Sequence, residues 1–287
     1  MIDDPFVAHR GLLFTVAYEM LGSAVDAEDV VQETWLRWAD VDHAEVRDPR
    51  AYLVRIVTRQ ALNRLRSVSR RREEYVGEWL PEPLLTSPDV ADDVDLAESV
   101  SIAMLTVLET LGPAERAVFV LHEVFETPYD EIAEVVGKTP AAVRQIAHRA
   151  RQHVAARRPR MPVDRAQQEA TMGKFMAAIS SGDLQGLLEI LAPDVVLIAD
   201  GGGLVQAARK PIIGATTVAA FLARVAELPD LVATTTWLNG TPGALVDVGG
   251  ESTAVSLVVE DGRISRIYAI RNPQKLRSLG KVAELRR

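Results

Sequence analysis

The sequence predicts a multidomain protein in which two all-α helical modules are followed by an α+β domain. Apolar residues recur at helical spacing from about residue 6 to about residue 156. A stretch rich in prolines and acidic residues interrupts this pattern at 75–95. After about residue 164, short strand patterns appear among the helical segments. The predicted division is therefore 1–74, the linker 75–95, 96–160 and 164–287, which fits a length of 287 residues at roughly 150 residues per domain.

Three helices are expected in the first module, at 6–21, 26–39 and 49–68. Asp26 and Asp29 form a plausible N-terminal capping arrangement for the second helix. Pro49 opens the third helix at a position that tolerates proline.

The spacing of side chains predicts an apolar face on the second helix and a basic face on the third. Trp35 and Trp38 fall among the apolar positions of the second helix, and both are expected in the core. Arg55, Arg59 and Arg66 recur at steps of four and seven along the third helix, which makes a basic stripe.

The linker combines acidic residues with an apolar pair, Trp79 and Leu80, that is followed by Pro81 and Pro83. Burying a tryptophan is worth several kcal/mol by area. We therefore expect Trp79 to dock on the C-terminal domain and to fix the arrangement of the modules. The alternative is local packing on the first module.

The second module contains a helix-turn-helix pattern. Helices are expected at 96–111, 113–125, 128–136 and 139–156, with Gly137 ending the third and Thr139-Pro140 opening the fourth. In the last helix the residues expected to pack inward are Val143, Ile146, Ala147 and Ala150, and those expected to face outward are Arg144, Gln145, His148 and Arg149. Arg151 is better placed for phosphates, which position DNA without specifying its sequence.

The C-terminal domain is expected to be α+β. Helices are predicted at 165–181, 184–191 and 215–228, and strands at 195–199, 234–238, 243–247, 254–260 and 263–270. Asp261-Gly262 joins the last two strands, and this pair is a strong hairpin signal.

Charge is distributed in blocks along a chain whose formal net charge is −8. Residues 47–72 hold nine arginines and one acid, residues 73–98 hold nine acids and no base, and residues 138–160 hold seven basic residues and no acid. In an acidic protein, two such basic segments indicate contact with nucleic acid at two places. The acidic block could also cover the first basic segment in the free protein.

Composition excludes several classes of protein. The absence of cysteine rules out disulfides, thiolate metal sites and thiol catalysis, and it suits a reducing cytosol. The N-terminus shows no signal peptide, and no apolar run approaches the roughly 18 residues of a membrane span. We expect a cytoplasmic protein with no membrane association, no cofactor, no metal ion and no catalytic residue.

Several motifs together resemble the extracytoplasmic-function sigma factors of bacterial RNA polymerase. DAEDVVQETWLRW (26–38) is similar to the polymerase-binding helix of region 2, and DPRAYLVRIVTRQALNRLRS (48–67) to the helix that melts and reads the minus-ten element. Residues 111–151 are similar to region 4, which reads the minus-thirty-five element. YVGEWLPEP (75–83), DGGG (200–203) and NPQKL (272–276) resemble motifs of the subgroup with a C-terminal SnoaL-like domain, related in fold to nuclear transport factor 2. The subgroup's DGGGK and NPDKL motifs carry Leu204 and Gln274 here, so no charge-dependent role is transferred to these positions.

The resemblance implies roles for individual residues. Core RNA polymerase would be bound by Asp29, Gln32, Glu33 and Leu36. Promoter DNA would be contacted at the minus-ten and minus-thirty-five elements by Arg55, Arg59, Asn63, Arg66, Thr139, Arg144, Gln145, His148, Arg149 and Arg151. Inter-domain regulation would involve Trp79, Leu80, Pro81, Glu82, Pro83, Asp200, Gly201, Gly202, Gly203, Asn272, Pro273, Lys275 and Leu276. The fused C-terminal domain would then modulate activity in place of a separate anti-sigma protein.

Three alternatives stay open from the sequence. The C-terminal fold is shared with polyketide cyclases and ketosteroid isomerases, in which an aspartate acts as a base, and Asp200 stands at roughly the matching place. The domain has no histidine and only one tyrosine, Tyr268, so a complete catalytic set is not visible. The cone of this domain could instead bind a small ligand. The chain could also be a helix-turn-helix regulator that never joins polymerase.

Overall fold

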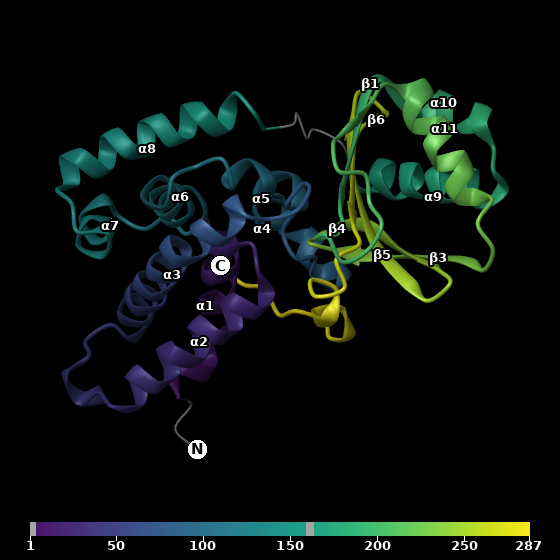
Figure 1. The fold of residues 1–287 in the computed structure, drawn as a ribbon. Coiled ribbons are helices and arrows are strands. Elements are labelled where there is room, and N and C mark those ends of the chain that lie inside the picture. Colours follow the sequence, from purple (N-terminus) through teal and green to yellow (C-terminus); the bar gives the residue numbers. More distant parts are fainter. Residues whose placement is uncertain (1–3, 159–163) are drawn as a thin grey trace.

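The computed structural model describes residues 4–158 and 164–287, and its fold matches the predicted class. Two helical modules lie together on one side, and an α+β domain lies on the other (Figure 1). None of the helices in the described ranges combines the length and the apolar character that a membrane crossing requires.

The first module consists of α1, α2 and α3, with a short 3-10 turn before α3. The bounds are α1 Pro5–Leu21, α2 Ala24–Ala39, η1 His43–Glu45 and α3 Pro49–Glu73. Gly22 ends α1 in the left-handed region at φ 63°. Ser23 caps α2 by accepting a hydrogen bond from the backbone N–H of Asp26. The expected cap by Asp26 and Asp29 is therefore wrong, because α2 starts earlier and Asp26 already lies in its first turn.

The two tryptophans of α2 have different surroundings. Trp38 is buried, stacks on His43, and donates from Nε1 to Asp4 Oδ1 at 3.0 Å. Trp35 is 42% exposed and forms a T-shaped pair with Phe6, so the expectation that it lies in the core is wrong. The inward face of α2 passes through Thr34 and Trp38, which leaves Trp35 beside the core rather than in it.

The second module packs directly against the first. Its bounds are α4 Val94–Val100, α5 Ile102–Leu108, α6 Pro113–Phe119, the π-helical turn η3 Val120–Val124, α7 Tyr129–Val136 and α8 Pro140–Ala155. The expected helix 96–111 is divided at Ser101, whose side chain caps α5 by accepting from Met104 N–H. The end of the expected helix 113–125 is a π turn. One continuous hydrophobic core contains side chains of both modules.

The C-terminal domain is a curved mixed sheet with helices on one face. Its bounds are α9 Arg165–Ser181, α10 Leu184–Ile190, β1 Leu191–Asp200, β2 Ile212–Ile213, α11 Ala215–Ala226, β3 Leu231–Leu238, β4 Thr241–Val248, β5 Glu251–Glu260, β6 Arg263–Ile270 and the 3-10 turn η4 Arg277–Gly280. The strand order is β2-β1-β6-β5-β4-β3, and β1 pairs with β6 in parallel while the other pairs are antiparallel. The other face of the sheet is turned toward the helical modules (Figure 1).

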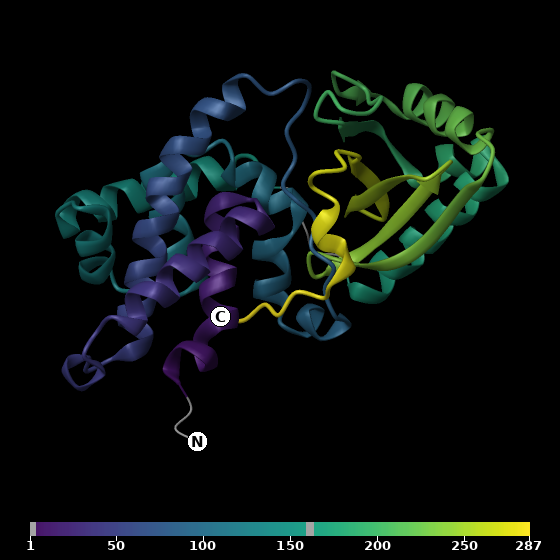
Figure 2. The same ribbon diagram turned by 60° about the horizontal axis from the view of Figure 1, so that its bottom comes forward.

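The linker lies along the boundary between the helical modules and the C-terminal domain (Figure 2). Leu80 and Leu84 are buried, and a 3-10 turn covers η2 Pro88–Asp92. Glu82 accepts hydrogen bonds from Ser23 Oγ at 2.7 Å and from the first free N–H of α2, Ala24, at 2.7 Å. This carboxylate therefore completes the N-terminal cap of α2 from outside the first module.

The end of the chain returns to the first module. The segment after η4 runs back to α1 in both views (Figures 1 and 2). Leu285 is buried in the shared helical core, and the N–H of Arg286 donates to Thr15 Oγ1 at 3.0 Å. Three parts of the chain therefore contact the helical modules: the linker, the sheet of the C-terminal domain and this final segment.

A buried charged cluster lies where the two modules meet. Arg116 of α6 is 1% exposed, donates from Nε to the carbonyl oxygen of Glu19 at 2.8 Å, and pairs with Glu109. Glu19 of α1 is also buried and accepts from Ser99 Oγ at 2.7 Å. Burial raises the pKa of Glu19 to about 8 and lowers the pKa of Arg116 to about 9.

The raised pKa of Glu19 predicts a pH-dependent stability. The folded protein binds a proton at Glu19 more tightly than the unfolded chain does, so this stabilisation is complete below about pH 4.5 and is lost as the pH rises toward about 8. We expect the thermal midpoint to fall more between pH 5.5 and 7.5 in the unaltered protein than in Glu19→Gln. The upper limit of the effect is about 1.4 kcal/mol per pH unit. Glu189→Gln, at an exposed position of α10, is the control, and equal slopes in all three proteins would contradict the prediction.

Candidate nucleic-acid surfaces and inter-domain site

The basic face of α8 is open to solvent. Thr139 caps the helix by accepting from Ala142 N–H at 3.3 Å, and Gly137 makes the preceding turn at φ 67°. The residues that pack on the rest of the second module are Val143, Ile146, Ala147 and Ala150, and the exposed ones are Arg144, Gln145, His148 and Arg149. The inward and outward faces are those that the sequence predicts. Four polar side chains on one exposed face of a helix can reach base edges in a major groove.

Arg151 lies about one turn beyond His148 on α8, and its side chain is close to a carboxylate. Its Nε is 3.7 Å from Glu123 Oε1, and Arg158 near the end of the helix pairs with Glu98. Both arginines are exposed, so these pairs are weak and can exchange for phosphate.

The basic stripe of α3 is partly covered by the second module. Arg55 Nη1 is 3.5 Å from Glu134 Oε2 of α7, and Arg59 Nη2 donates to the carbonyl oxygen of Glu134 at 3.1 Å. Asn63 and Arg66, further along α3, are exposed. The carboxylate that pairs with Arg55 comes from α7 rather than from the linker.

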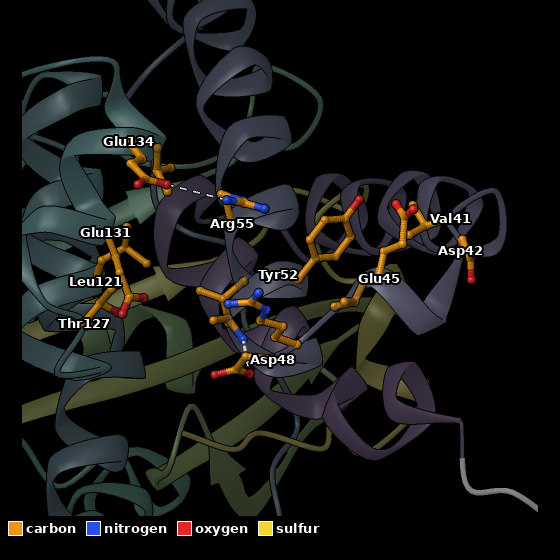
Figure 3. Close-up of a pocket in the computed structure, with 15 residues that line it drawn as sticks. Val41, Asp42, Glu45, Asp48, Tyr52, Arg55, Leu121, Thr127, Glu131 and Glu134 are labelled. Atoms are coloured by element: carbon orange, nitrogen blue, oxygen red, sulfur yellow. Dashed lines mark hydrogen bonds and ion pairs between the residues drawn. The ribbon is translucent and has the colours of Figure 1, made fainter.

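A cleft of about 680 Å³ separates the start of α3 from α7. Figure 3 shows Tyr52 and Arg55 on one wall and Glu131 and Glu134 on the other, with the ion pair between Arg55 and Glu134 drawn across it. The Arg55 guanidinium also lies 5.3 Å from the centre of the Tyr52 ring. The expected minus-ten surface thus faces α7 of the second module across this cleft.

The predicted polymerase-binding residues share the outer face of α2. Gln32, Glu33 and Leu36 are exposed, and Leu36 is 64% exposed beside the unexpectedly exposed Trp35. Asp29 is half-buried and pairs with Arg64 of α3 at 2.8 Å. The face is therefore an apolar centre with a polar margin, which is the composition of a protein-binding surface.

Asp200 is the centre of the predicted inter-domain site, and its carboxylate is completely buried. Lys275 Nζ lies 2.7 Å from Oδ2, the N–H of Leu80 donates to Oδ2 at 2.9 Å, and Tyr75 Oη donates to Oδ1 at 2.6 Å. The N–H of Gly202 donates to Oδ1 at 3.0 Å. The linker, the glycine turn and the end of the domain thus all converge on one carboxylate, which we call the Asp200 site.

Lys275 completes the Asp200 site from the NPQKL segment. Its Nζ donates to the carbonyl oxygen of Leu80 at 2.5 Å and lies 4.0 Å from the centre of the Trp79 ring. Asn272 Nδ2 donates to Tyr75 Oη at 2.8 Å. Trp79 also lies against Gly22 of the first module, where an added Cβ would be 2.9 Å from its ring. Both expected contacts of Trp79 are therefore present.

The glycines of the DGGG motif allow this close approach. A Cβ on Gly202 would lie 2.2 Å from Asn272 Nδ2, and one on Gly201 would lie 2.6 Å from the carbonyl oxygen of Val205. Gly202 and Gly203 also adopt φ of 60° and 71°.

The other predicted inter-domain residues have varied surroundings. Pro81 and Pro83 are buried, and Leu276 packs beside Leu80. Pro273 is exposed, so its expected place in the contact is wrong: it lies on the outer side of the turn that directs Asn272 and Lys275 inward. The two positions that depart from the subgroup's motifs, Leu204 and Gln274, are also exposed.

Asn239 is a functional residue that the sequence did not predict, and it is fully buried at the tip of the β3–β4 hairpin. Its Nδ2 donates to Tyr18 Oη at 2.7 Å and to the carbonyl oxygen of Val100 at 2.8 Å, and its Oδ1 accepts from Leu84 N–H at 2.9 Å. Asn239-Gly240 is a strong hairpin signal that could have located the turn. Nothing in the sequence indicates that the turn is buried between modules.

The orientation of Asp200 bears on the catalytic alternative. Leu197 and Ala199 of β1 pack in the core under the helices, whereas Ile198 belongs to the core on the opposite face. Asp200, two residues after Ile198, shares that opposite face and contacts the linker. Its carboxylate is thus occupied by cationic and N–H donors rather than exposed in a pocket. Within residues 4–158 and 164–287, no cluster of three or more histidine or carboxylate side chains is arranged to hold a metal.

Comparison with known proteins agrees with this arrangement. The model of Sigma-70 region 2 matches residues 6–71, and that of Sigma-70, region 4 matches residues 101–154. The chain is 39% identical to the ECF RNA polymerase sigma factor SigJ of Mycobacterium tuberculosis, over 94% of this chain and 91% of that protein. It is 36% identical to the probable ECF RNA polymerase sigma factor SigI of the same species, over 94% and 92%.

A solved structure extends the similarity to the whole fold. The crystal structure of M. tuberculosis SigJ has a TM-score of 0.80 to this structure at 35% identity, covering 96% of this chain and 98% of that one. Together with the order of the motifs, these matches show that the chain belongs to the extracytoplasmic-function sigma factors of RNA polymerase.

Proposed function

We propose that this sigma factor binds core RNA polymerase through α2, reads promoter DNA through α3 and α8, and is regulated by its own C-terminal domain. The observation that carries the regulatory part is the Asp200 site, where Tyr75 and Leu80 of the linker form hydrogen bonds with a buried ion pair of the C-terminal domain. Such a role places the protein in the cytoplasm, where polymerase and chromosomal DNA meet. The proposal includes the division of the chain into the first module (1–74), the linker (75–95), the second module (96–160) and the C-terminal domain (164–287).

Transcription by reconstituted enzyme tests the proposal directly. Purified full-length protein is added to core RNA polymerase with a library of genomic fragments, and the 5′ ends of the transcripts are sequenced. A sigma factor produces transcripts whose start sites share upstream elements at fixed spacing. A helix-turn-helix regulator that never joins polymerase gives no transcripts above those of core enzyme alone.

A catalytic role of the C-terminal domain is the less supported alternative. A general base needs access to its substrate, whereas Asp200 is buried against the linker and bound by Lys275. A cone ligand has weaker support than inter-domain contact, because apolar side chains from α9, α11 and the sheet pack together on the helix-covered face.

Leu36→Ser is expected to weaken binding to core polymerase at least tenfold with little change in stability. An exposed apolar side chain at an interface centre contributes mostly to binding. Val94→Ser, at an exposed valine of the second module, is the matched control. The measurement is fluorescence titration with core enzyme together with the thermal midpoint. Equal affinities for both variants would remove α2 from the polymerase contact.

Arg144→Ala is expected to weaken promoter binding by about 1–3 kcal/mol at one base position and to relax the preference there. Arg157→Ala, at an exposed position after α8, should instead weaken binding to all sequences and reduce the salt slope by about 0.9. Binding-site selection with each variant separates the two effects. Uniform weakening by Arg144→Ala would reassign that arginine to phosphate contact.

Lys275→Met is expected to destabilise the protein by about 3–5 kcal/mol, because it leaves the buried Asp200 carboxylate without its counter-ion. The double variant Asp200→Asn with Lys275→Met should recover much of this loss, since no charge remains uncompensated. Denaturant unfolding of the two single variants and the double variant gives the coupling. Additive losses would show that the two groups do not act as a pair.

A further inference from the structure

The tip of the β3–β4 hairpin is inserted between the two promoter-reading modules. Asn239 adopts φ 52° and is completely buried, with both side-chain amide hydrogens bonded, one to Tyr18 of α1 and one to Val100 of α4. Its backbone N–H and its Oδ1 both pair with Leu84 of the linker. One residue of the C-terminal domain therefore joins the first module, the linker and the second module.

The adjacent glycine shows how closely the tip is seated. A Cβ on Gly240 would lie 2.8 Å from Ala97 Cα, and Gly240 itself adopts φ 72°. The N–H of Gly240 donates to Thr86 Oγ1 at 3.0 Å. The tip thus fits against α4 and the linker by backbone contact, which leaves no space for a larger residue.

The same closed arrangement covers part of the expected minus-ten surface. Glu134 of α7 places its carboxylate by Arg55 (Figure 3). Its carbonyl oxygen accepts from Arg59, so two oxygen acceptors lie where phosphates would be bound. These pairs are exposed and are worth little by themselves. The groups that hold α7 in place must therefore be buried ones elsewhere in the contact between the modules.

Asn239 supplies buried bonds to both modules at once. Loss of its side chain leaves Val100 O and Leu84 N–H buried without these partners, and buried polar groups without partners are strongly unfavourable. Separating the modules breaks at least one of its bonds, to Tyr18 or to Val100.

We propose that the hairpin tip is an autoinhibitory contact, in which Asn239 holds the second module on the first so that Glu134 covers Arg55 and Arg59. This inference rests on the proposed role of these two arginines in binding the promoter strand. The C-terminal domain is then a negative regulator of promoter opening in the free protein. Release of the tip exposes the arginines to single-stranded DNA.

The test compares two alanine substitutions at matched turns of one sheet. Asn239→Ala and Asp261→Ala each replace a residue of positive φ that precedes glycine in a hairpin, but Asp261 is exposed. Because the chain has no cysteine, Asp40→Cys and Gln152→Cys allow two spin labels to report the distance between the modules. Binding of a fluorescent 12-nucleotide single-stranded DNA of random sequence is measured against salt concentration in the full-length protein.

We expect Asn239→Ala to lengthen and broaden the label distance and to tighten DNA binding about tenfold or more, because three side-chain hydrogen bonds are lost. The plot of log affinity against log salt should steepen by about 1.4, the value for two added phosphate contacts on a single strand. Asp261→Ala should change neither quantity. Adding Arg55→Ala and Arg59→Ala to Asn239→Ala should abolish the gain.

Each of the other outcomes refutes one part of the proposal. An unchanged label distance in Asn239→Ala refutes the hairpin contact as the element that holds the modules together. A longer distance without tighter DNA binding refutes the covering role of Glu134. A gain in binding that survives loss of both arginines refutes their role in the promoter contact, and with it this part of the proposed function.

A milder variant keeps the test valid where Asn239→Ala fails to fold. Tyr18→Phe removes the hydroxyl that accepts from Asn239 and donates to Glu82 O at 2.6 Å, with no change in the hairpin. It should shift both quantities in the same direction by a smaller factor. No shift in a folded Tyr18→Phe protein, judged by circular dichroism, refutes the proposal.

Discussion

A buried carboxylate must be compensated, and the arrangement of this protein depends on how Asp200 is compensated. Its partners come from the linker, from the glycine turn and from Lys275 near the end of the chain. Because the linker N–H of Leu80 is one of them, this bond fixes the linker to the sheet at Leu80. From this point the linker places Glu82 at the start of α2 and Leu84 at Asn239, so one charge helps to position two further contacts between modules.

The contact between the modules is stabilised by groups that are also costly to bury. The shared core contributes apolar burial, but Glu19 and Arg116 lie inside it with shifted pKa values and regain full hydration when the modules separate. Buried ion pairs add little net stability relative to apolar side chains of the same size. A contact between modules that is built in this way can be well defined and still separate at a modest cost in free energy.

Local chemistry explains which parts could be predicted from the sequence. The helix-turn-helix is determined by Gly137, the Thr139 cap and the apolar spacing of α8, all of which act within a few residues. The burial of Asn239 and the pairing of Arg55 with Glu134 depend on residues far apart in the chain, which no local pattern encodes. Trp35 was placed wrongly for a related reason: it follows the inward Thr34 on α2, and the position of the neighbouring helices decides whether it is covered. The motif resemblance pointed to the residues of the Asp200 site, but the exposure of Pro273 depends on the path of the turn and not on the motif.

The two DNA surfaces differ in accessibility, and this difference implies an order of events. The outer face of α8 is exposed in the closed state, whereas Arg55 and Arg59 on α3 are occupied by Glu134. If the proposed roles of the two helices hold, duplex recognition by α8 needs no rearrangement, whereas capture of a melted strand by Arg55 and Arg59 of α3 requires that Glu134 of α7 move away. In the proposed autoinhibitory contact, separation of the second module from the first breaks a bond of Asn239 to Tyr18 or to Val100, which would link strand capture to release of the C-terminal hairpin. Under this linkage, any partner that binds the separated modules more tightly than the closed ones activates the factor.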